Sequence, residues 1–400
     1  MAQSVIILGR QPALGIAELE SLYGADKLAI LGQQAVLLDI DPAEVTFNRL
    51  GGSVKLARLL TTLDVTDWAA VQAWLRQTVP EHLQYLPEGK LQLGISVYGL
   101  DVSVSRLNAS GLELKKVIRA AGRSVRLIPN KAPALNSAQV IHNNLTGPLG
   151  WELLFVRAGS RTYVAQTVQE QDIDAYAARD QARPKRDARV GMLPPKLAQI
   201  IINLALGNTA PVSLLDPFCG TGVLLQEALL MGYDVCGSDI DPRMAEFSQK
   251  NLNWLFKAYL SKQPPSPNGL LPATISFLEI ADATQHTWSM CNTIAAETYL
   301  GRPFSAEPKS EVLQEVIQDV NTIHRKFLQN VTRQTKPGFR MCIAVPAWKT
   351  TTGFRHLPVL DQLTDLGYNR LSFVHASNRE LIYHRPEQIV ARELVVLQRN

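Results

Sequence analysis

Residues 212–244 read VSLLDPFCGTGVLLQEALLMGYDVCGSDIDPRM and give the clearest structural pattern in the chain. The apolar run 212–215 predicts a buried strand, and residues 223–231 predict a helix. Between them, Gly220 and Gly222 let the backbone of a turn approach a ligand closely at the helix amino terminus. A strand, a glycine turn and a helix in this order predict an α/β unit with a ligand at the carboxyl edge of its sheet.

Acids follow the next two predicted strands. The second strand ends at Asp239, where a carboxylate can accept hydrogen bonds from both hydroxyls of a ribose. The third strand, within TISFLEIADAT, ends near Asp282, which can bind the exocyclic amine of an adenine. The three strand ends together predict a cofactor that contains adenosine.

The turn itself narrows the choice of cofactor. A P-loop needs GxxxxGK[ST], and this turn has no lysine, while a dinucleotide fingerprint needs a third glycine. The segment DPFCGTG instead resembles motif I of S-adenosylmethionine-dependent methyltransferases, and among these the amino-methyltransferases of nucleic acids. The resemblance implies S-adenosyl-L-methionine as cofactor, with contacts from Pro195, Asp216, Phe218, Gly220, Gly222, Asp239, Ile240 and Asp282.

Other segments extend the resemblance over nearly the whole chain. Residues 171–205 resemble the segment that joins the THUMP domain to the catalytic domain in tRNA guanosine-N2-methyltransferases, the class acting on position 10 of tRNA. Residues 5–24 are similar to the N-terminal ferredoxin-like domain of that family, and residues 90–99 resemble the start of its THUMP domain. Residues 379–399 resemble its closing strand pair.

The family resemblance implies an α/β fold with several domains. A Rossmann-like class I methyltransferase domain, with a mostly parallel seven-stranded sheet, is expected after a ferredoxin-like and THUMP α+β RNA-binding region. The expected boundaries are 1–60 for the ferredoxin-like domain, 61–168 for the THUMP domain, 169–190 for a linker and 191–400 for the methyltransferase domain. The linker is expected from its polar composition.

A loop at residues 297–301, ETYLG, follows the fourth predicted strand. In the family this place holds an acid or amide, two prolines and an aromatic residue, which orient an exocyclic amine. By carry-over, Glu297 and the carbonyl of Thr298 hold the amine, and Tyr299 stacks on the base. Thr298 and Tyr299 stand where the family has prolines, so the loop is expected to be less rigid than in the family.

This departure leaves three interpretations open. In the first, the loop is active and the protein methylates the N2 amine of a guanosine in tRNA. In the second, the site is altered or inactive and the protein is an RNA-binding module. In the third, the protein is an amino-methyltransferase of another nucleic acid. The intact acids on the cofactor side favour the first, and the RNA-type N-terminal region disfavours DNA as the substrate.

The net charge of +4 is modest, but its distribution is uneven. No acid occurs between Glu113 and Glu152, a window that contains Lys115, Lys116, Arg119, Arg123, Arg126 and Lys131. A second basic cluster, residues 183–189, includes Arg183 and Arg186. Such clusters neutralise phosphates, so these residues are the predicted tRNA-binding surface. For the arginines near residue 183, a salt bridge at the domain joint is the alternative.

The sequence also indicates that a metal site, a membrane span and a signal peptide are not expected. The 4 cysteines and 7 histidines have no metal-ligand spacing, so no metal is expected, and His324 is interpreted as a packing or surface residue. No apolar run approaches the ~20 residues of a membrane span, and the start of the chain does not resemble a signal peptide. We therefore expect a cytoplasmic protein with no membrane partner.

Overall fold

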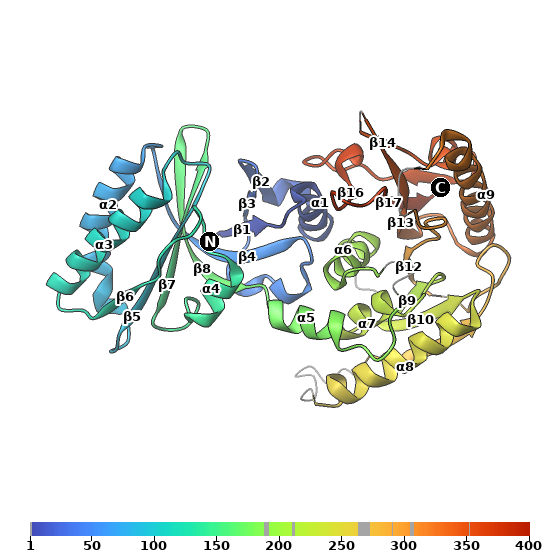
Figure 1. The fold of residues 1–400 in the computed structure, drawn as a ribbon, viewed down its shortest axis with the longest axis horizontal. Helices are drawn as coiled ribbons and strands as arrows, with labels where there is room; N and C mark the ends of the chain where they lie inside the picture. Colours follow the sequence, from blue (N-terminus) through green and yellow to red (C-terminus); the bar gives the residue numbers. More distant parts are fainter. Residues whose placement is uncertain are drawn as a thin grey trace. The chain divides into compact units, whose positions relative to one another are not determined.

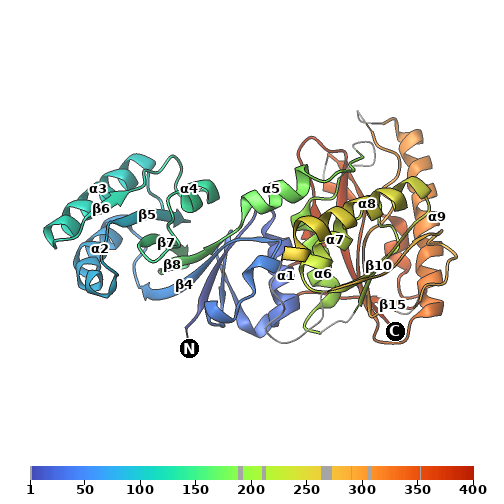
Figure 2. The same cartoon turned by 90° about the horizontal axis from the view of Figure 1, so that it is seen from below.

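The structure is a computed structural model that describes residues 2–187, 192–209, 213–262, 273–289, 291–304, 308–351 and 353–400. The chain forms two compact units (Figures 1 and 2). Unit 1 comprises Met1–Pro12, Asp26–Asn48 and Gly52–Ile173. Unit 2 comprises Ala13–Ala25, Arg49–Gly51 and Asp174–Asn400.

Unit 1 is built on one mixed sheet. Its strand order is β2 (Leu28–Leu31), β3 (Ala35–Leu38), β1 (Ser4–Leu8), β4 (Ser53–Leu63), β8 (Arg161–Glu170), β7 (Gly150–Ala158), β5 (Leu91–Tyr98) and β6 (Val125–Leu127). The strand β5 pairs in parallel with β6 and β7, whereas the other pairings are antiparallel. The predicted boundary after residue 60 falls within β4, which pairs with both β1 and β8.

Two helices of unit 1 cover the β5–β7 part of this sheet (Figure 1). The helix α2 (Trp68–His82) begins after Asp67, whose side chain accepts a hydrogen bond from the Ala70 amide. The longer α3 (Val104–Ala120) directs Leu107, Leu114 and Ile118 into the same apolar core. The short α4 (Ser137–His142) begins at a capping box formed by Asn136 and Gln139.

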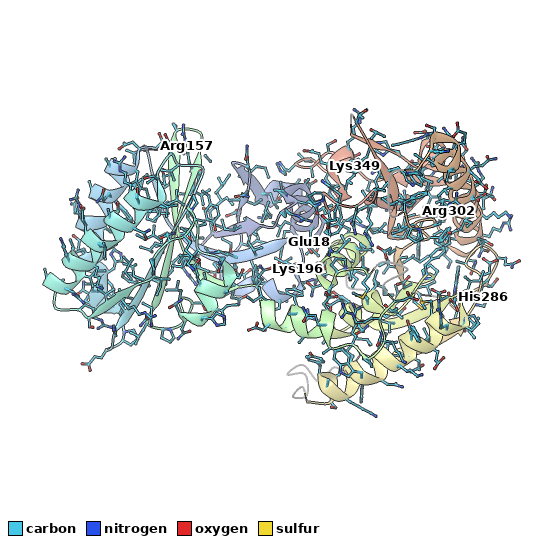
Figure 3. The ribbon with its side chains drawn as sticks, viewed as in Figure 1. Glu18, Arg157, Lys196, His286, Arg302 and Lys349 are labelled. Atoms are coloured by element: carbon cyan, nitrogen blue, oxygen red, sulfur yellow. The ribbon has the colours of Figure 1, made fainter. Side chains whose placement is uncertain are left out.

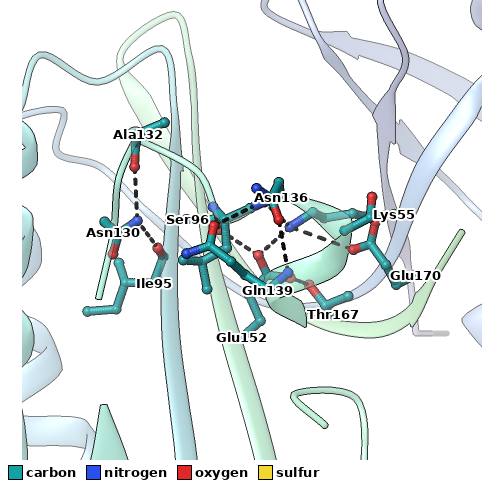
Figure 4. Close-up of polar contacts among 12 residues, drawn as sticks. Lys55, Ile95, Ser96, Asn130, Ala132, Asn136, Gln139, Glu152, Thr167 and Glu170 are labelled. Carbon is teal, nitrogen blue, oxygen red and sulfur yellow. Dashed lines mark hydrogen bonds and ion pairs between the residues drawn. The ribbon is translucent and has the colours of Figure 1, made fainter. Parts of the chain in front are cut away.

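A buried lysine ties several strands of unit 1 together (Figure 4). Nζ of Lys55 on β4 pairs with Glu152 on β7 and donates to the carbonyl of Leu135 at 2.9 Å. Glu152 also accepts from the hydroxyls of Ser96 at 2.5 Å and Thr167 at 2.6 Å. A buried charge is stable only when it has hydrogen-bond or ion-pair partners. The partners here lie on different strands, so the network joins β4, β5, β7 and β8.

Unit 2 is built on a mostly parallel sheet, as the predicted class I fold requires. Its order is β11 (Ile275–Ile280), β10 (Asp234–Asp239), β9 (Ser213–Asp216), β12 (Thr293–Glu297), β13 (Arg340–Thr350), β17 (Val390–Arg399) and β15 (Tyr368–Arg370). The first five are parallel, and β17 is antiparallel to both of its neighbours. Two short strands, β14 (Gly353–Arg355) and β16 (Ile382–Tyr383), pair with β13 and β17.

Helices lie on both faces of this sheet (Figures 1 and 2). The long α9 (Ser310–Gln334) packs Val320, Phe327 and Val331 onto one face. The other face is covered by α6 (Pro195–Leu206), α7 (Val223–Leu230) and α8 (Pro242–Ala258). The strand–turn–helix order predicted for residues 212–231 is therefore present from Ser213 onward, and Val212 lies outside the described residues.

Two helices outside residues 191–400 also belong to unit 2. The first is α1 (Pro12–Tyr23), where Oε1 of the buried Glu18 accepts from Nδ2 of Asn203 on α6 at 2.7 Å. The second is α5 (Ile173–Gln181), which forms within the segment expected to be a linker. Arg179 of α5 pairs with the buried Glu227 of α7 at 2.8 Å, so tertiary contacts order a segment whose polar composition predicts a loop.

Candidate active site

A cavity of about 1000 Å³ lies in unit 2 and is lined by residues that follow β9, β10, β11 and β12. Most of the predicted cofactor and catalytic residues line it, namely Asp216, Phe218, Gly220, Asp239, Ile240, Asp282, Glu297, Thr298 and Tyr299. Pro195, a predicted cofactor contact, is the first residue of α6 and does not line the cavity. Met192 and Leu193, just before it, line the cavity instead. The carboxyl edge of the parallel strands thus brings together residues that are up to 83 positions apart, from Asp216 to Tyr299.

The two glycines of the turn have different roles. Both have positive φ, 51° for Gly220 and 80° for Gly222, a conformation that favours glycine. The amide of Gly220 donates to Oδ2 of Asp239 at 2.8 Å, and this glycine lines the cavity. A Cβ on Gly222 would lie 2.8 Å from Oγ of Ser248 on α8. Gly222 therefore allows the turn to pack on α8, and Gly220 faces the ligand side.

Asp239 lies at the end of β10 with its carboxylate held by backbone amides. Oδ2 accepts from Gly220 and Oδ1 accepts from Asp241 at 2.9 Å. Burial raises the pKa of Asp239, while these two amides act in the opposite direction. Each carboxylate oxygen has a second lone pair, so the orientation is fixed and acceptor capacity remains for a hydroxyl pair.

Asp282, beyond the end of β11, is the second acid on this side. Partial burial raises its pKa, but hydrogen bonds from the amide and hydroxyl of Thr284 and from Gln285 outweigh that effect and lower the pKa. Asp282 is therefore ionised and fixed at the cavity wall. Ile240, between the two acids in the lining, is 67% exposed and offers an apolar surface to a flat ring.

Asp216 is the most deeply buried acid of the lining. It ends β9, and its Oδ1 accepts from the amide of Phe218 at 3.1 Å. Burial raises its pKa well above the ordinary value, and the neighbouring carboxylates of Asp239 and Glu297 raise it further. The ring of Phe218 packs edge-on against Phe327 of α9, with centroids 5.0 Å apart. Asp216 and Phe218 thus hold the glycine turn in place through these buried contacts.

Glu297, the last residue of β12, pairs with Arg392 of β17. Burial raises the pKa of Glu297, whereas the charge and the hydrogen bond of Arg392 lower it. Arg392 lines the same cavity and is itself buried. Arg392 is not among the residues predicted from sequence, although one arginine and one glutamate within the apolar run of residues 390–397 are a detectable signal.

Thr298 is buried and tied to two elements. Its Oγ1 lies 2.6 Å from Nε2 of His324 on α9 and 2.9 Å from the carbonyl of Ala344 on β13. Its amide donates to the same carbonyl at 3.1 Å. The expectation that loss of the first proline would free the loop is therefore wrong at this residue, because hydrogen bonds hold Thr298. His324, expected to be a packing or surface residue, is buried and anchors the loop.

The rest of the loop covers one wall of the cavity. Tyr299 is 45% exposed and lines the cavity, so its ring is accessible to a ligand. Gly301 has φ of 86°, and a Cβ there would lie 3.0 Å from Cγ1 of Val316 on α9. This glycine therefore permits the close approach of the loop to α9.

The predicted RNA-binding residues differ in accessibility. In unit 1, Lys116, Arg119, Arg126 and Lys131 are exposed, whereas Lys115 and Arg123 are half-buried, and Arg123 donates to the carbonyl of Pro87. These residues lie on α3, on β6 and in the segments that follow them.

In unit 2, Arg186 is exposed and its Nε lies 3.3 Å from Sδ of Met192. The side chain of Arg183 is 1% exposed and pairs with Asp180 at 3.0 Å. Arg183 was predicted either to contact RNA or to form a salt bridge. The structure contains the ion pair, and the guanidinium is not exposed to solvent. Arg189, the last residue of the predicted basic cluster, lies outside the described residues.

Two further properties concern the described part of the chain. None of its His, Cys, Asp and Glu residues form a group of three or more placed to hold a metal ion. None of its helices is both long and apolar enough to cross a bilayer.

Known proteins resemble this chain in two ways. Residues 183–257 match the family model of the UPF0020, RMKL-like methyltransferase domain. A tRNA (guanine(10)-N2)-dimethyltransferase of Methanothermobacter thermautotrophicus is 49% identical over 75 residues, which are 18% of this chain and 22% of that protein. One of Methanocaldococcus jannaschii is 37% identical over 91 residues, 23% of this chain and 26% of that protein. The matched part thus spans about a quarter of the length of these relatives.

The fold is similar over a longer range than the sequence. The crystal structure of TrmN from Thermus thermophilus aligns over 100% of both chains with a TM-score of 0.52 and 18% sequence identity. This identity is low, so the similarity supports the architecture. Residues 183–257 include α7, β10 and most of α8, and they contain the turn and Asp239 that line the cavity. In these residues the chain is similar to the UPF0020, RMKL-like methyltransferase domain.

Proposed function

We propose that the protein is an S-adenosyl-L-methionine-dependent methyltransferase that methylates the exocyclic N2 amine of a guanosine in tRNA, at position 10. The observation that carries the proposal is that one cavity holds Asp239 and Asp282 together with the Glu297–Tyr299 loop. The names of the two relatives, 49% identical over 75 residues and 37% identical over 91 residues, support the choice of guanine N2 and of tRNA. A ferredoxin-like and THUMP region before the methyltransferase domain, with the boundaries given above, is part of this proposal.

The residues present fit S-adenosyl-L-methionine. Asp239 keeps acceptor capacity for the two ribose hydroxyls, and Asp282 is an ionised acceptor for the adenine amine. A Cβ placed on Gly220 would meet only the carbonyl of Phe218, at 3.9 Å, so the space beside this backbone is open to a ligand. Ile240 offers the apolar surface against which adenine packs. When bound, the cofactor supplies an electrophilic methyl group.

The Glu297–Tyr299 loop acts by orientation. The lone pair of a guanine N2 amine is delocalised into the ring, so the amine is a poor nucleophile unless its hydrogens are held. Glu297, held in place by Arg392, whose charge opposes the effect of burial on its pKa, accepts one of these hydrogen bonds, and the carbonyl of Thr298 accepts the other. Tyr299 stacks on the base. Alignment of the reacting atoms, rather than a strong base, supplies most of the rate.

The basic residues of unit 1 are proposed to bind the tRNA phosphates. Four of them are exposed, namely Lys116, Arg119, Arg126 and Lys131, in a stretch of chain that has no acid. In unit 2, Arg186 is exposed. Binding through such contacts releases counterions and falls steeply with salt.

The test is incubation with methyl-labelled S-adenosyl-L-methionine and either unmodified tRNA or duplex DNA. The proposal predicts label in tRNA alone, recovered after digestion as N2-methylguanosine or N2,N2-dimethylguanosine. Label in adenine or cytosine amines, or in DNA, would contradict the substrate. Binding of tRNA without any transfer would favour the altered-site interpretation.

A further inference from the structure

We infer that Gln388 makes the site specific for guanine by accepting a hydrogen bond from N1–H of the target base; this inference rests on the proposed function. Gln388 lines the cavity that also contains Glu297 and Arg392. Its Oε1 is buried and has no hydrogen-bond donor among the residues that the structure describes. Buried acceptors in proteins are nearly always paired, so an unpaired one in a ligand cavity indicates a donor that arrives with the ligand.

The fold holds Gln388 at the cavity wall. The residue closes a turn in which its amide donates to the carbonyl of Arg385 at 3.0 Å. Lys349, on β13 and labelled in Figure 3, donates two hydrogen bonds to carbonyls of this segment. Its amide donates to the carbonyl of Ile389 at 2.9 Å, and its Nζ donates to the carbonyl of Pro386 at 3.2 Å. The position of Gln388 is therefore set by the sheet as well as by its own loop.

The hydrogen-bond donors on the edge of guanine explain why one cavity would contain two acceptors, Glu297 and Gln388. Guanine presents N1–H and the N2 amine side by side, so two adjacent donors require two acceptors. Glu297 is the acceptor proposed for the amine, and Arg392, four residues after Gln388, holds it. An amine acceptor alone cannot tell guanine from another aminopurine. The second acceptor, Oε1 of Gln388, rejects a base whose N1 is itself an acceptor because two lone pairs would then face each other.

The experiment compares two synthetic tRNAs that differ at the target nucleotide. One has guanosine and the other 2-aminopurine, which keeps the amine but has neither N1–H nor O6. The ratio of kcat/KM values for methyl transfer is measured for wild type, Gln388→Leu and Gln388→Glu. Wild type is expected to prefer guanosine by at least ~100-fold, since a site built for a hydrogen bond rejects analogues that lack it. Gln388→Leu should lower the preference at least ~10-fold, whereas Gln388→Glu, which keeps an acceptor, should retain it.

The control is Gln249→Leu, the same substitution at an exposed position of α8 outside the cavity lining. It should leave the ratio unchanged. Folding is checked by cofactor binding, and Gln388→Ala replaces the leucine variant if that one does not fold. A folded Gln388→Leu or Gln388→Ala variant with the wild-type ratio would overturn the inference and leave the proposed function intact. Absence of transfer by wild type to the guanosine tRNA would overturn the proposed function, and the inference with it.

Discussion

Glu297 and Arg392 form an ion pair at the wall of the cavity. The residues that flank either partner in the sequence do not predict this pair. The carboxylate has two oxygens, and Arg392 contacts Oε1, so acceptor capacity remains for an amine. Arg392 also opposes the effect of burial on the pKa of Glu297. At the scale of single residues, we therefore propose that Glu297 orients the amine and that Arg392 holds Glu297 in place and favours its ionised form.

Glu297→Ala should slow methyl transfer by at least ~100-fold, the low end for removal of one oriented polar group from the transition state. Cofactor affinity should stay within a factor of about two because Glu297 ends β12, and β9 separates this strand from β10 and β11, which Asp239 and Asp282 follow. Single-turnover kinetics and calorimetry measure the two quantities. A variant that transfers methyl at the wild-type rate would remove Glu297 from the mechanism. Glu387→Ala, the same substitution at another glutamate of the lining, is the matched control.

Arg392→Met should move the pH dependence of the rate. Arg392 lowers the pKa of Glu297, so its removal raises that pKa. Because the carboxylate is the active form, the acid limb of the pH–rate profile should shift to higher pH in Arg392→Met. Arg392→Lys retains the charge and should shift it less. An unchanged acid limb in a folded methionine variant would show that Arg392 has only a structural role.

Asp239→Ala should weaken binding of S-adenosyl-L-methionine by about 2–4 kcal/mol, the value of a pair of charge-assisted hydrogen bonds at a partly buried site. Titration calorimetry gives the affinity. The control is Asp365→Ala, at an exposed position outside the cavity lining. Equal affinity in the folded Asp239 variant and in wild type would show that the ribose lies elsewhere.

At the scale of elements, the sheet edge of unit 2 was predictable and the attachments of its loops were not. The glycine turn and the acids at 239, 282 and 297 follow from local patterns of strand, turn and helix. Thr298–His324 and Glu297–Arg392 join residues 26 and 95 positions apart, and no local pattern encodes such contacts. The helix α5 was missed for a similar reason, since its order comes from Arg179 and Glu227 rather than from its own propensity.

The polar network of unit 1 gives a stability prediction at the same scale. Burial raises the pKa of Glu170 on β8 to about 7, and the attraction of Lys55 only partly opposes this. The folded state thus binds a proton that the unfolded state releases near its lower pKa of about 4.5. The free energy of unfolding should therefore fall as the pH rises through the window from about 4.5 to 7, and stay level above it.

Glu170→Gln should remove most of this slope and be more stable than wild type at pH 8 by on the order of 1–3 kcal/mol. Urea unfolding at pH 5 and pH 8 measures the difference, and Glu44→Gln, at an exposed position of unit 1, serves as control. A wild-type protein with no loss of stability between these pH values would contradict the raised pKa.

At the scale of the whole molecule, the proposed division of labour assigns tRNA capture to the basic face of unit 1 and chemistry to the cavity of unit 2. The resemblance in fold to TrmN covers the full length of both chains, whereas the family model matches residues 183–257 and the relative of Methanothermobacter thermautotrophicus matches 18% of this chain. The fold is therefore similar over many more residues than the sequence is. Many sequences have the apolar pattern that this fold requires, and few have the residues that the glycine turn requires.

Neutralising Lys116, Arg119 and Arg126 together should weaken tRNA binding and lower the salt slope by about 2–3, roughly one for each phosphate that is no longer neutralised. Filter binding over a range of salt concentrations measures both quantities. Alanine substitution of Lys257, Arg333 and Lys336, which are exposed in unit 2, changes the net charge equally and should leave the slope nearly intact. Equal effects of the two triple variants would show that net charge, and not this face, determines binding.

The central claim is transfer of a methyl group to the N2 amine of one guanosine in tRNA, and fragment mapping by mass spectrometry tests it most directly. An unmodified tRNA transcript is incubated with wild type and S-adenosyl-L-methionine, cleaved with a ribonuclease, and each fragment is weighed and sequenced. We predict a gain of one or two methyl groups on the guanine at position 10, and none when that nucleotide is adenosine. A transcript that is bound but returns with no methyl group at any guanine would contradict the claim.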